Sequence, residues 1–154
     1  MNMFDLFASD AIAQDLSANC MRQLFHELGT LAHKAYRLDA RMVADALCER
    51  ESRGSTAMWG GVAIPHARLP ELNGTVGLFV RLKTPIDLKA TDGQAVDLVF
   101  VILSQERASA DHLVALARVS RLLGNHRMRE KLRNTSTAQA LYALITEPEA
   151  SEAA

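Results

Sequence analysis

The first third of the chain carries apolar residues at every third or fourth position, which is the periodicity of an amphipathic helix. The residues that follow this spacing are Cys20, Leu24, Leu28, Leu31 and Ala35. Ser17 or Asn19 is expected to cap the helix, because a short polar side chain accepts a hydrogen bond from a free backbone N–H at a helix start. A short extended segment is expected before it, at about residues 11–16.

A second helix is expected after Asp39, which is placed as its N-cap, and should end near Arg50 or Glu51. Its apolar face consists of Met42, Val43, Ala46 and Leu47. The polar, glycine-rich segment that follows, residues 51–61, predicts a loop.

The middle of the chain changes to the pattern of β-strands. Residues 75–83 alternate and are rich in β-favouring side chains, which predicts a strand. Residues 85–104 predict two extended pieces joined by a turn at residues 91–93. Residues 96–103 are almost wholly apolar, which indicates a strand buried on both faces at the centre of a sheet.

Helical periodicity returns in the last third, at Leu113, Leu116, Ala117 and Leu123. Ser109 or Asp111 is expected to cap this helix, and Gly124 to end it. A short helix at about residues 126–132 should follow.

A final helix, capped by Thr135 or Ser136, completes the predicted elements. Helices, then strands, then helices indicate an α/β (α+β) fold of three layers, in which helices cover both faces of a mixed central β-sheet. Strands that follow each other through short turns are expected to pair antiparallel.

Composition predicts an ordinary globular protein. The chain has 154 residues, 49% hydrophobic and 23% charged, so we expect one domain over residues 1–154, with a core at about 10–146 and a frayed tail at 147–154. Lys and Arg number 17 against 18 Asp and Glu, a formal charge of −1, so nucleic acid is not expected as a partner.

A cytoplasmic protein without membrane insertion is expected. No apolar run approaches the length of a membrane span, and the first residues lack the basic start and apolar run of a secretory signal. Cys20 and Cys48 share no CxxC spacing, and both fall in helix-like patterns, so we expect them to be reduced and buried.

His66 is the leading candidate for chemistry because of the residues that precede it. Glycines at 60 and 61 let the backbone turn tightly, the apolar triplet 62–64 anchors the segment in the core, and Pro65 restricts the backbone. The imidazole is therefore expected on a stiff support beside an open loop, which suits a nucleophile. Taken alone, a proline–histidine pair at a turn is more often incidental.

Groups that bind a phosphoryl group lie nearby in the sequence. Ser55 and Thr56 supply hydroxyls, and Arg50 supplies a guanidinium at an expected helix end. Arg68 is a further nearby cation, and His112 is a second imidazole that the fold can bring close. Each of these, taken singly, also fits a solvated or structural role.

No metal site or cofactor is expected. The other histidines are interpreted as surface or structural residues, and no HExxH pattern is present. The sequence also lacks a Walker A motif, which argues against direct use of ATP.

Three separated parts of the chain together resemble the enzyme IIA proteins of the fructose/mannitol/nitrogen class of the bacterial phosphotransferase system, and most closely its nitrogen-regulatory branch. The resemblance runs from about Cys20 to Ile145. It is carried by Arg50-Glu51, Gly54-Ser55-Thr56, Gly61-Val62-Ala63-Ile64-Pro65-His66, Thr84-Pro85-Ile86-Asp87, Asp92-Gly93-Gln94, Val96-Asp97-Leu98, His112-Leu113 and Leu116.

The resemblance implies the enzyme IIA fold of the mannitol/nitrogen type and a role for each matching residue. His66 would be the phosphorylated nucleophile, and His112 would hydrogen-bond the phosphoryl group or orient the ring. Arg50 would neutralise phosphoryl charge, while Ser55 and Thr56 would line the site. The protein that donates the phosphoryl group to His66 would be a histidine phosphocarrier protein (HPr-like or NPr-like).

The chain departs from the family pattern at Ala57-Met58-Trp59, where small glycine-rich residues are usual. Met58, Trp59 and Leu69 are candidates for an apolar rim on which the donor docks. For His66 itself, we expect Nδ1–H to donate to a backbone carbonyl, so that Nε2 is the free nucleophile.

The leading functional hypothesis is a phosphocarrier with a regulatory output in nitrogen or potassium physiology, acting on kinases or potassium-transport components. One alternative is a sugar-transport enzyme IIA that passes phosphate to an enzyme IIB. Another is a non-catalytic binding module of the same fold, against which the pair His66 and His112 argues. A metal-dependent hydrolase is disfavoured because no third protein ligand is evident.

Overall fold

A mixed five-stranded sheet forms the centre of the computed structural model, which describes residues 2–107 and 110–147. Its order is β1–β4–β5–β2, and β3 also pairs with β5. The strands are β1 (Phe7–Leu16), β2 (Val62–Ala63), β3 (His66–Leu69), β4 (Thr75–Ile86) and β5 (Val96–Gln105). The expected antiparallel pairing holds for β4 and β5, but β1 runs parallel to β4, and β2 and β3 run parallel to β5.

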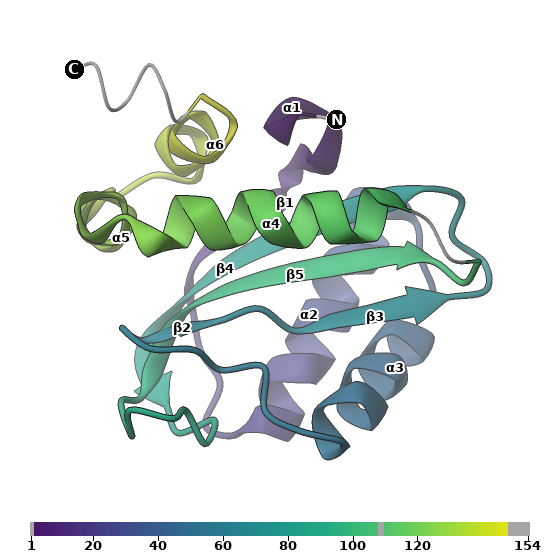
Figure 1. Ribbon diagram of the computed structural model, residues 1–154, viewed down its shortest axis with the longest axis horizontal. Helices are drawn as coiled ribbons and strands as arrows, with labels where there is room; N and C mark the ends of the chain where they lie inside the picture. Colours follow the sequence, from purple (N-terminus) through teal and green to yellow (C-terminus); the bar gives the residue numbers. More distant parts are fainter. Residues whose placement is uncertain (1, 108–109, 148–154) are drawn as a thin grey trace.

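Helices cover both faces of this sheet, as the sequence predicts (Figure 1). One face packs on α2 (Met21–Tyr36) and α3 (Ala40–Ser52). The other packs on α1 (Met3–Leu6), α4 (Ala110–Gly124), α5 (His126–Asn134) and α6 (Ala138–Thr146). Within the described parts of the chain, no helix is both long and apolar enough to cross a membrane.

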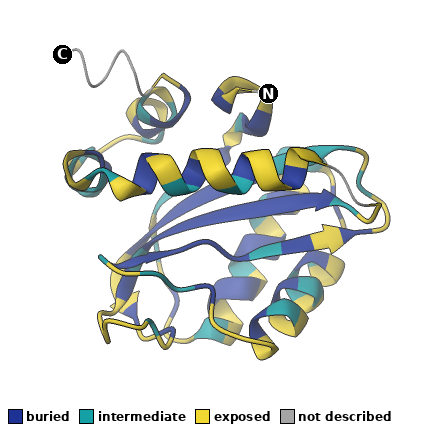
Figure 2. Cartoon of the chain, in the orientation of Figure 1, coloured by how far each residue is buried: buried dark blue, intermediate teal, exposed yellow. Residues whose placement is uncertain are grey.

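The expected central strand, β5, separates two apolar cores (Figure 2). Val99, Val101 and Leu103 belong to the core on the α2–α3 side. Leu98, Phe100 and Ile102 belong to the core on the α4–α6 side. This alternation is the two-residue period of a strand buried on both faces, which the run at residues 96–103 indicates.

Several predicted helix boundaries are shifted. Asp39 caps α3 as expected, accepting a hydrogen bond from the Met42 backbone N–H. The N-cap of α2 is Cys20, which makes no side-chain cap bond, rather than Ser17 or Asn19. Short polar residues stand close together at these points, and the fold decides which of them begins the helix.

The remaining cap predictions have mixed outcomes. Thr137, not Thr135 or Ser136, caps α6 through its hydroxyl. Asp111 lies inside the first turn of α4, and Ser109 lies outside the described residues. The first extended segment begins earlier than expected, at Phe7, after the short helix α1.

Both cysteines are exposed, so the expectation that they are buried is wrong. Cys20 is at the N-cap of α2, and Cys48 is on the outward side of α3. The helix-like pattern around each thiol is real, but neither thiol occupies the apolar face of its helix.

Candidate functional site

His66 is the first residue of β3 and follows a break in the sheet edge at Pro65. Proline has no N–H to donate, so β2 ends before it, but its carbonyl accepts a hydrogen bond from the Ile102 N–H at 3.0 Å. His66 then pairs with Ile102 of β5. Because Ala67 packs in the core on the α2–α3 side, the half-buried His66 side chain faces the opposite side of the sheet, toward α4.

A main-chain hydrogen bond fixes the polarity of the His66 ring. Its Nδ1 lies 2.9 Å from the carbonyl oxygen of Ile64. A carbonyl oxygen only accepts, so Nδ1 carries the hydrogen and the neutral ring has its free lone pair on Nε2. This confirms the expected bond between Nδ1–H and a backbone carbonyl.

His112, in the first turn of α4, is the second imidazole of the site. The centroids of the His66 and His112 rings are 5.6 Å apart, with an interplanar angle of 60°. His112 is buried, and its Nδ1 lies 2.8 Å from the hydroxyl oxygen of Ser104 on β5. Burial, followed by the nearby His66 and Arg68, lowers the pKa of His112 from its usual value, which favours the neutral ring.

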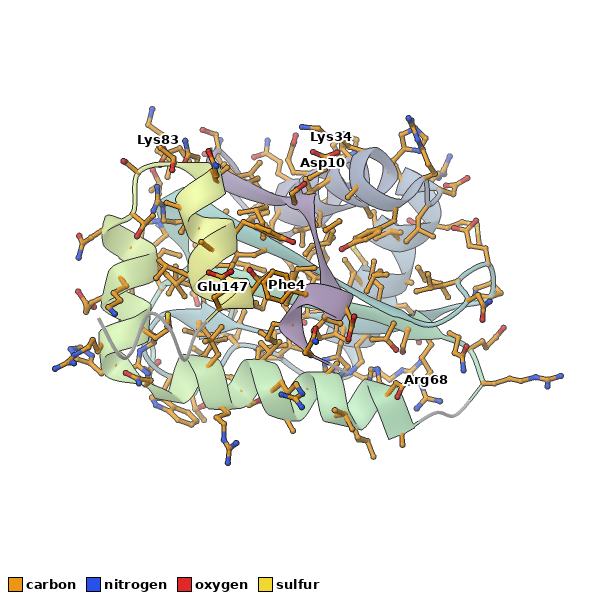
Figure 3. The ribbon with its side chains drawn as sticks, turned by 90° about the horizontal axis from the view of Figure 1, so that it is seen from above. Phe4, Asp10, Lys34, Arg68, Lys83 and Glu147 are labelled. Atoms are coloured by element: carbon orange, nitrogen blue, oxygen red, sulfur yellow. The ribbon has the colours of Figure 1, made fainter. Side chains whose placement is uncertain are left out.

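Arg68 is a third member of the site, although the sequence shows it only as a nearby cation. It stands two residues after His66 on β3, and so on the same face of the strand. Its side chain is exposed and lies beside the amino-terminal end of α4 (Figure 3). The i, i+2 spacing within a strand is the signal that identifies it, once β3 is known to begin at His66.

The segment that carries Ser55 and Thr56 runs antiparallel to the residues leading into His66. Ala57 bridges to Ala63, and the Ile64 N–H donates to the Thr56 carbonyl at 3.1 Å. The predicted lining residues therefore lie beside the chain segment that leads into His66.

The side chains of the predicted lining residues, and of Arg50 as the predicted charge neutraliser, have partners other than the histidines. Ser55 donates its hydroxyl to the Leu88 carbonyl at 2.7 Å, and Arg50 Nη1 donates to the Gly54 carbonyl at 3.0 Å. The hydroxyl and backbone N–H of Thr56 both donate to the buried carboxylate of Glu51, at 2.7 and 2.9 Å. Thr56 thus anchors the loop to the end of α3, with Glu51 as an anchor that sequence reasoning missed.

Two of the three predicted rim residues are at the surface. Trp59 is 58% exposed, and Met58 is half-buried against the core on the α4–α6 side. Leu69 is 1% exposed and packs in the core on the α2–α3 side, so its assignment to a docking rim is wrong. Alternation along β3 explains this, because Leu69 and His66 face opposite sides of the sheet. Leu113 and Val114, which follow His112, are exposed apolar residues that sequence reasoning did not assign to the rim.

The loop that holds Trp59 is fixed at Gly60. The Gly60 carbonyl accepts from Nη2 of Arg133 at 2.5 Å, and its N–H donates to Asp92 at 3.0 Å. Arg133 also pairs with Asp97, with 2.9 Å between Nε and the nearer carboxylate oxygen. These contacts come from three distant parts of the sequence and were not predicted.

The described residues contain no group of three or more potential metal-binding side chains. What they bring together is a half-buried imidazole with its free lone pair on Nε2, a second imidazole with a lowered pKa, and a cation. This set can form a covalent bond to phosphorus and stabilise the charge of a phosphoryl group.

Comparison with known proteins agrees with this chemistry. A nitrogen regulatory protein from Bradyrhizobium diazoefficiens is 45% identical over 153 residues, covering 99% of this chain and all of that protein. The fructose-specific EIIABC component of the phosphotransferase system from Bacillus subtilis is 31% identical over 148 residues, 96% of this chain and 23% of that protein. The crystal structure of nitrogen regulatory protein IIA-Ntr from Neisseria meningitidis has a TM-score of 0.86 and 32% identity, covering 92% of this chain and 97% of the other.

Residues 5–147 match the family described as "Phosphoenolpyruvate-dependent sugar phosphotransferase system, EIIA 2". The match takes in β1 to α6, including both histidines of the site. The chain therefore belongs to the EIIA 2 family of the phosphotransferase system and resembles nitrogen regulatory proteins over almost its whole length.

Proposed function

We propose that the protein is a phosphocarrier that accepts a phosphoryl group on Nε2 of His66 from a histidine phosphocarrier protein. The Nε2 lone pair attacks phosphorus, the N–P bond of the donor phosphohistidine breaks, and its electron pair returns to the donor ring. The observation that carries the proposal is the 2.9 Å bond from Nδ1 to the Ile64 carbonyl, because it leaves Nε2 unprotonated in the neutral ring.

The neighbouring groups fit a transfer that depends on positioning and charge stabilisation. In this proposal His112 hydrogen-bonds the phosphoryl group on His66, and Arg50 and Arg68 reduce the cost of its negative charge. Ser55 and Thr56 shape the wall of the site, with Thr56 acting through its bonds to Glu51. Met58 and Trp59 form the docking rim for the donor.

A regulatory output is favoured over simple storage of phosphate. A phosphoryl group adds a charge of about −1.5 to −2, which changes what the surface around His66 binds. The 45% identity to a nitrogen regulatory protein over 99% of this chain supports targets in nitrogen or potassium physiology, such as kinases or potassium-transport components. We place this activity in the cytoplasm, where free thiols such as Cys20 and Cys48 stay reduced.

A second candidate function is sugar transport, in which His66 passes its phosphoryl group to an enzyme IIB. The 31% identity to the fructose-specific EIIABC component favours it. Adding candidate enzyme IIB proteins to the phosphorylated protein separates the two, since only a transport component loses its label rapidly to an enzyme IIB.

The proposal is tested by incubating the protein with enzyme I, a histidine phosphocarrier and labelled phosphoenolpyruvate. We expect one acid-labile, alkali-stable phosphoryl group, absent from His66→Ala and retained in His26→Ala, which removes an exposed histidine on α2. His112→Ala should still bind the donor but accept the group slowly. Unchanged labelling of His66→Ala would show that the site is wrongly assigned, and an unlabelled wild-type protein would favour a non-catalytic module.

A further inference from the structure

Ser104 is a buried polar residue in an otherwise apolar row. Every second residue of β5 faces α4–α6, and the row begins Leu98, Phe100 and Ile102. Ser104 continues this row and is 1% exposed. A hydroxyl at such a position costs stability unless it is hydrogen-bonded, so its partner needs an explanation.

That partner is His112. The Ser104 hydroxyl lies 2.8 Å from His112 Nδ1, and it makes no other hydrogen bond within residues 2–107 and 110–147. If Nδ1–H donated to the serine, the hydroxyl hydrogen would be buried without an acceptor. The hydroxyl therefore donates, and the Nδ1 lone pair accepts.

The two imidazoles are thus held with opposite polarity. On His66, Nδ1 donates to a carbonyl, so a lone pair is left on Nε2. On His112, Nδ1 accepts from a hydroxyl, so the hydrogen of the neutral ring is on Nε2. Burial and nearby positive charge favour the neutral ring of His112, and in the neutral ring the tautomer decides whether Nε2 donates or accepts.

We infer that Ser104 is a positioning residue, which fixes His112 as the Nε2–H tautomer and so makes it a hydrogen-bond donor to a phosphoryl group on His66. The role at the phosphoryl group rests on the proposed function, but the tautomer does not. A phosphoryl oxygen accepts only, so the other tautomer would place a lone pair against its negative charge. His66 supplies the nucleophile and His112 supplies the hydrogen-bond donor, and the tautomer of each ring is set by a different local partner.

The test is two-bond 1H–15N NMR of the histidine rings in the unphosphorylated protein, recorded while the pH is raised until the spectra no longer change. We expect the hydrogen on Nε2 of His112 and on Nδ1 of His66. Ser104→Ala should remove the preference of His112 for Nε2–H, and Ser104→Thr, which keeps the hydroxyl, should retain it. An Nδ1–H tautomer of His112 in the wild-type protein, or the same tautomer in Ser104→Ala, would overturn the inference.

Phosphoryl transfer supplies the second readout. In Ser104→Ala we expect transfer to His66 to be roughly two- to tenfold slower, because in part of the population His112 no longer donates a hydrogen bond to the phosphoryl group. Ser104→Thr should restore the wild-type rate. Equal rates in Ser104→Ala and wild type would contradict the role at the phosphoryl group. If the wild-type protein accepts no phosphoryl group, the proposed function fails, while the NMR measurement still decides the tautomer. A variant that does not fold leaves the wild-type spectrum as the deciding result.

Discussion

The hydrogen bond between the Thr56 hydroxyl and Glu51 is predicted to hold the loop beside His66. Removing this bond should lower the free energy of unfolding by a measurable amount. Thr56→Val keeps the shape of the side chain and deletes only the donor, which lies 2.7 Å from a carboxylate oxygen. Thr56 and Glu51 are 9% and 8% exposed, so water cannot readily replace the lost bond. A hydrogen bond to a charged group contributes about 1.5–3 kcal/mol, and we expect the free energy of unfolding to fall by about 2 kcal/mol.

For a chain of this size that loss lowers the melting temperature by about 4–8 °C. Urea unfolding followed by circular dichroism measures it, and Thr30→Val is the matched control. The Thr30 hydroxyl also donates a hydrogen bond, here to the His26 carbonyl at 3.2 Å. Because Thr30 is exposed, we expect its loss to change the free energy of unfolding by no more than about 0.5 kcal/mol. If Thr56→Val costs no more than Thr30→Val, the loop is not held by this bond. Transfer to His66 should slow in parallel, because the loop shares a hydrogen-bonded path with Ile64.

Three further predictions concern buried or neighbouring charge. Arg81→Met should lower the free energy of unfolding, measured with urea, by about 3 kcal/mol. The reason is that the buried guanidinium donates to carbonyls at the end of α5, among them that of Leu132 at 2.8 Å. A loss as small as that caused by Arg41→Met, which changes an exposed arginine, would refute this. Arg68→Gln should raise the pKa of His112 in an NMR titration, since the Arg68 charge lowers it, and an unchanged or lower pKa would contradict its placement at the site. Because the pKa of His112 is lowered in the folded protein, the unfolded chain binds its proton more readily, and stability is lost as the pH falls below about 6.5. Between about pH 7.5 and 5.5, the free energy of unfolding of His112→Gln should therefore fall less than that of the wild-type protein. An equal fall in the two proteins would contradict the lowered pKa of His112.

The elements with strong local signals could be predicted from the sequence. The apolar run of β5 marks a central strand without reference to its neighbours, and Asp39 caps α3 because it is the polar residue at that helix start. Short or crowded signals were less informative. The four-residue helix α1 was missed, and Thr137 was passed over for the similar residues just before it.

The candidate site was predictable only in part, for a related reason. The residues before His66 indicate its stiff support, and the family resemblance points to His112. Glu51 appears in the sequence only as a motif residue without a role, and Ser104 gives no signal. A buried polar residue is recognised by its partner, and the partner is set by the fold. Leu69 was misplaced because its distance from His66 in the sequence is short, while strand alternation puts the two on opposite faces.

The central claim is that Nε2 of His66 carries the phosphoryl group. It is tested most directly by 31P–15N correlation NMR of the phosphorylated protein, labelled with 15N-histidine. The account predicts that phosphorus couples to Nε2 of His66, with the Nδ1 hydrogen still present. Coupling of phosphorus to Nδ1 of His66, or to any nitrogen of another histidine, would contradict it.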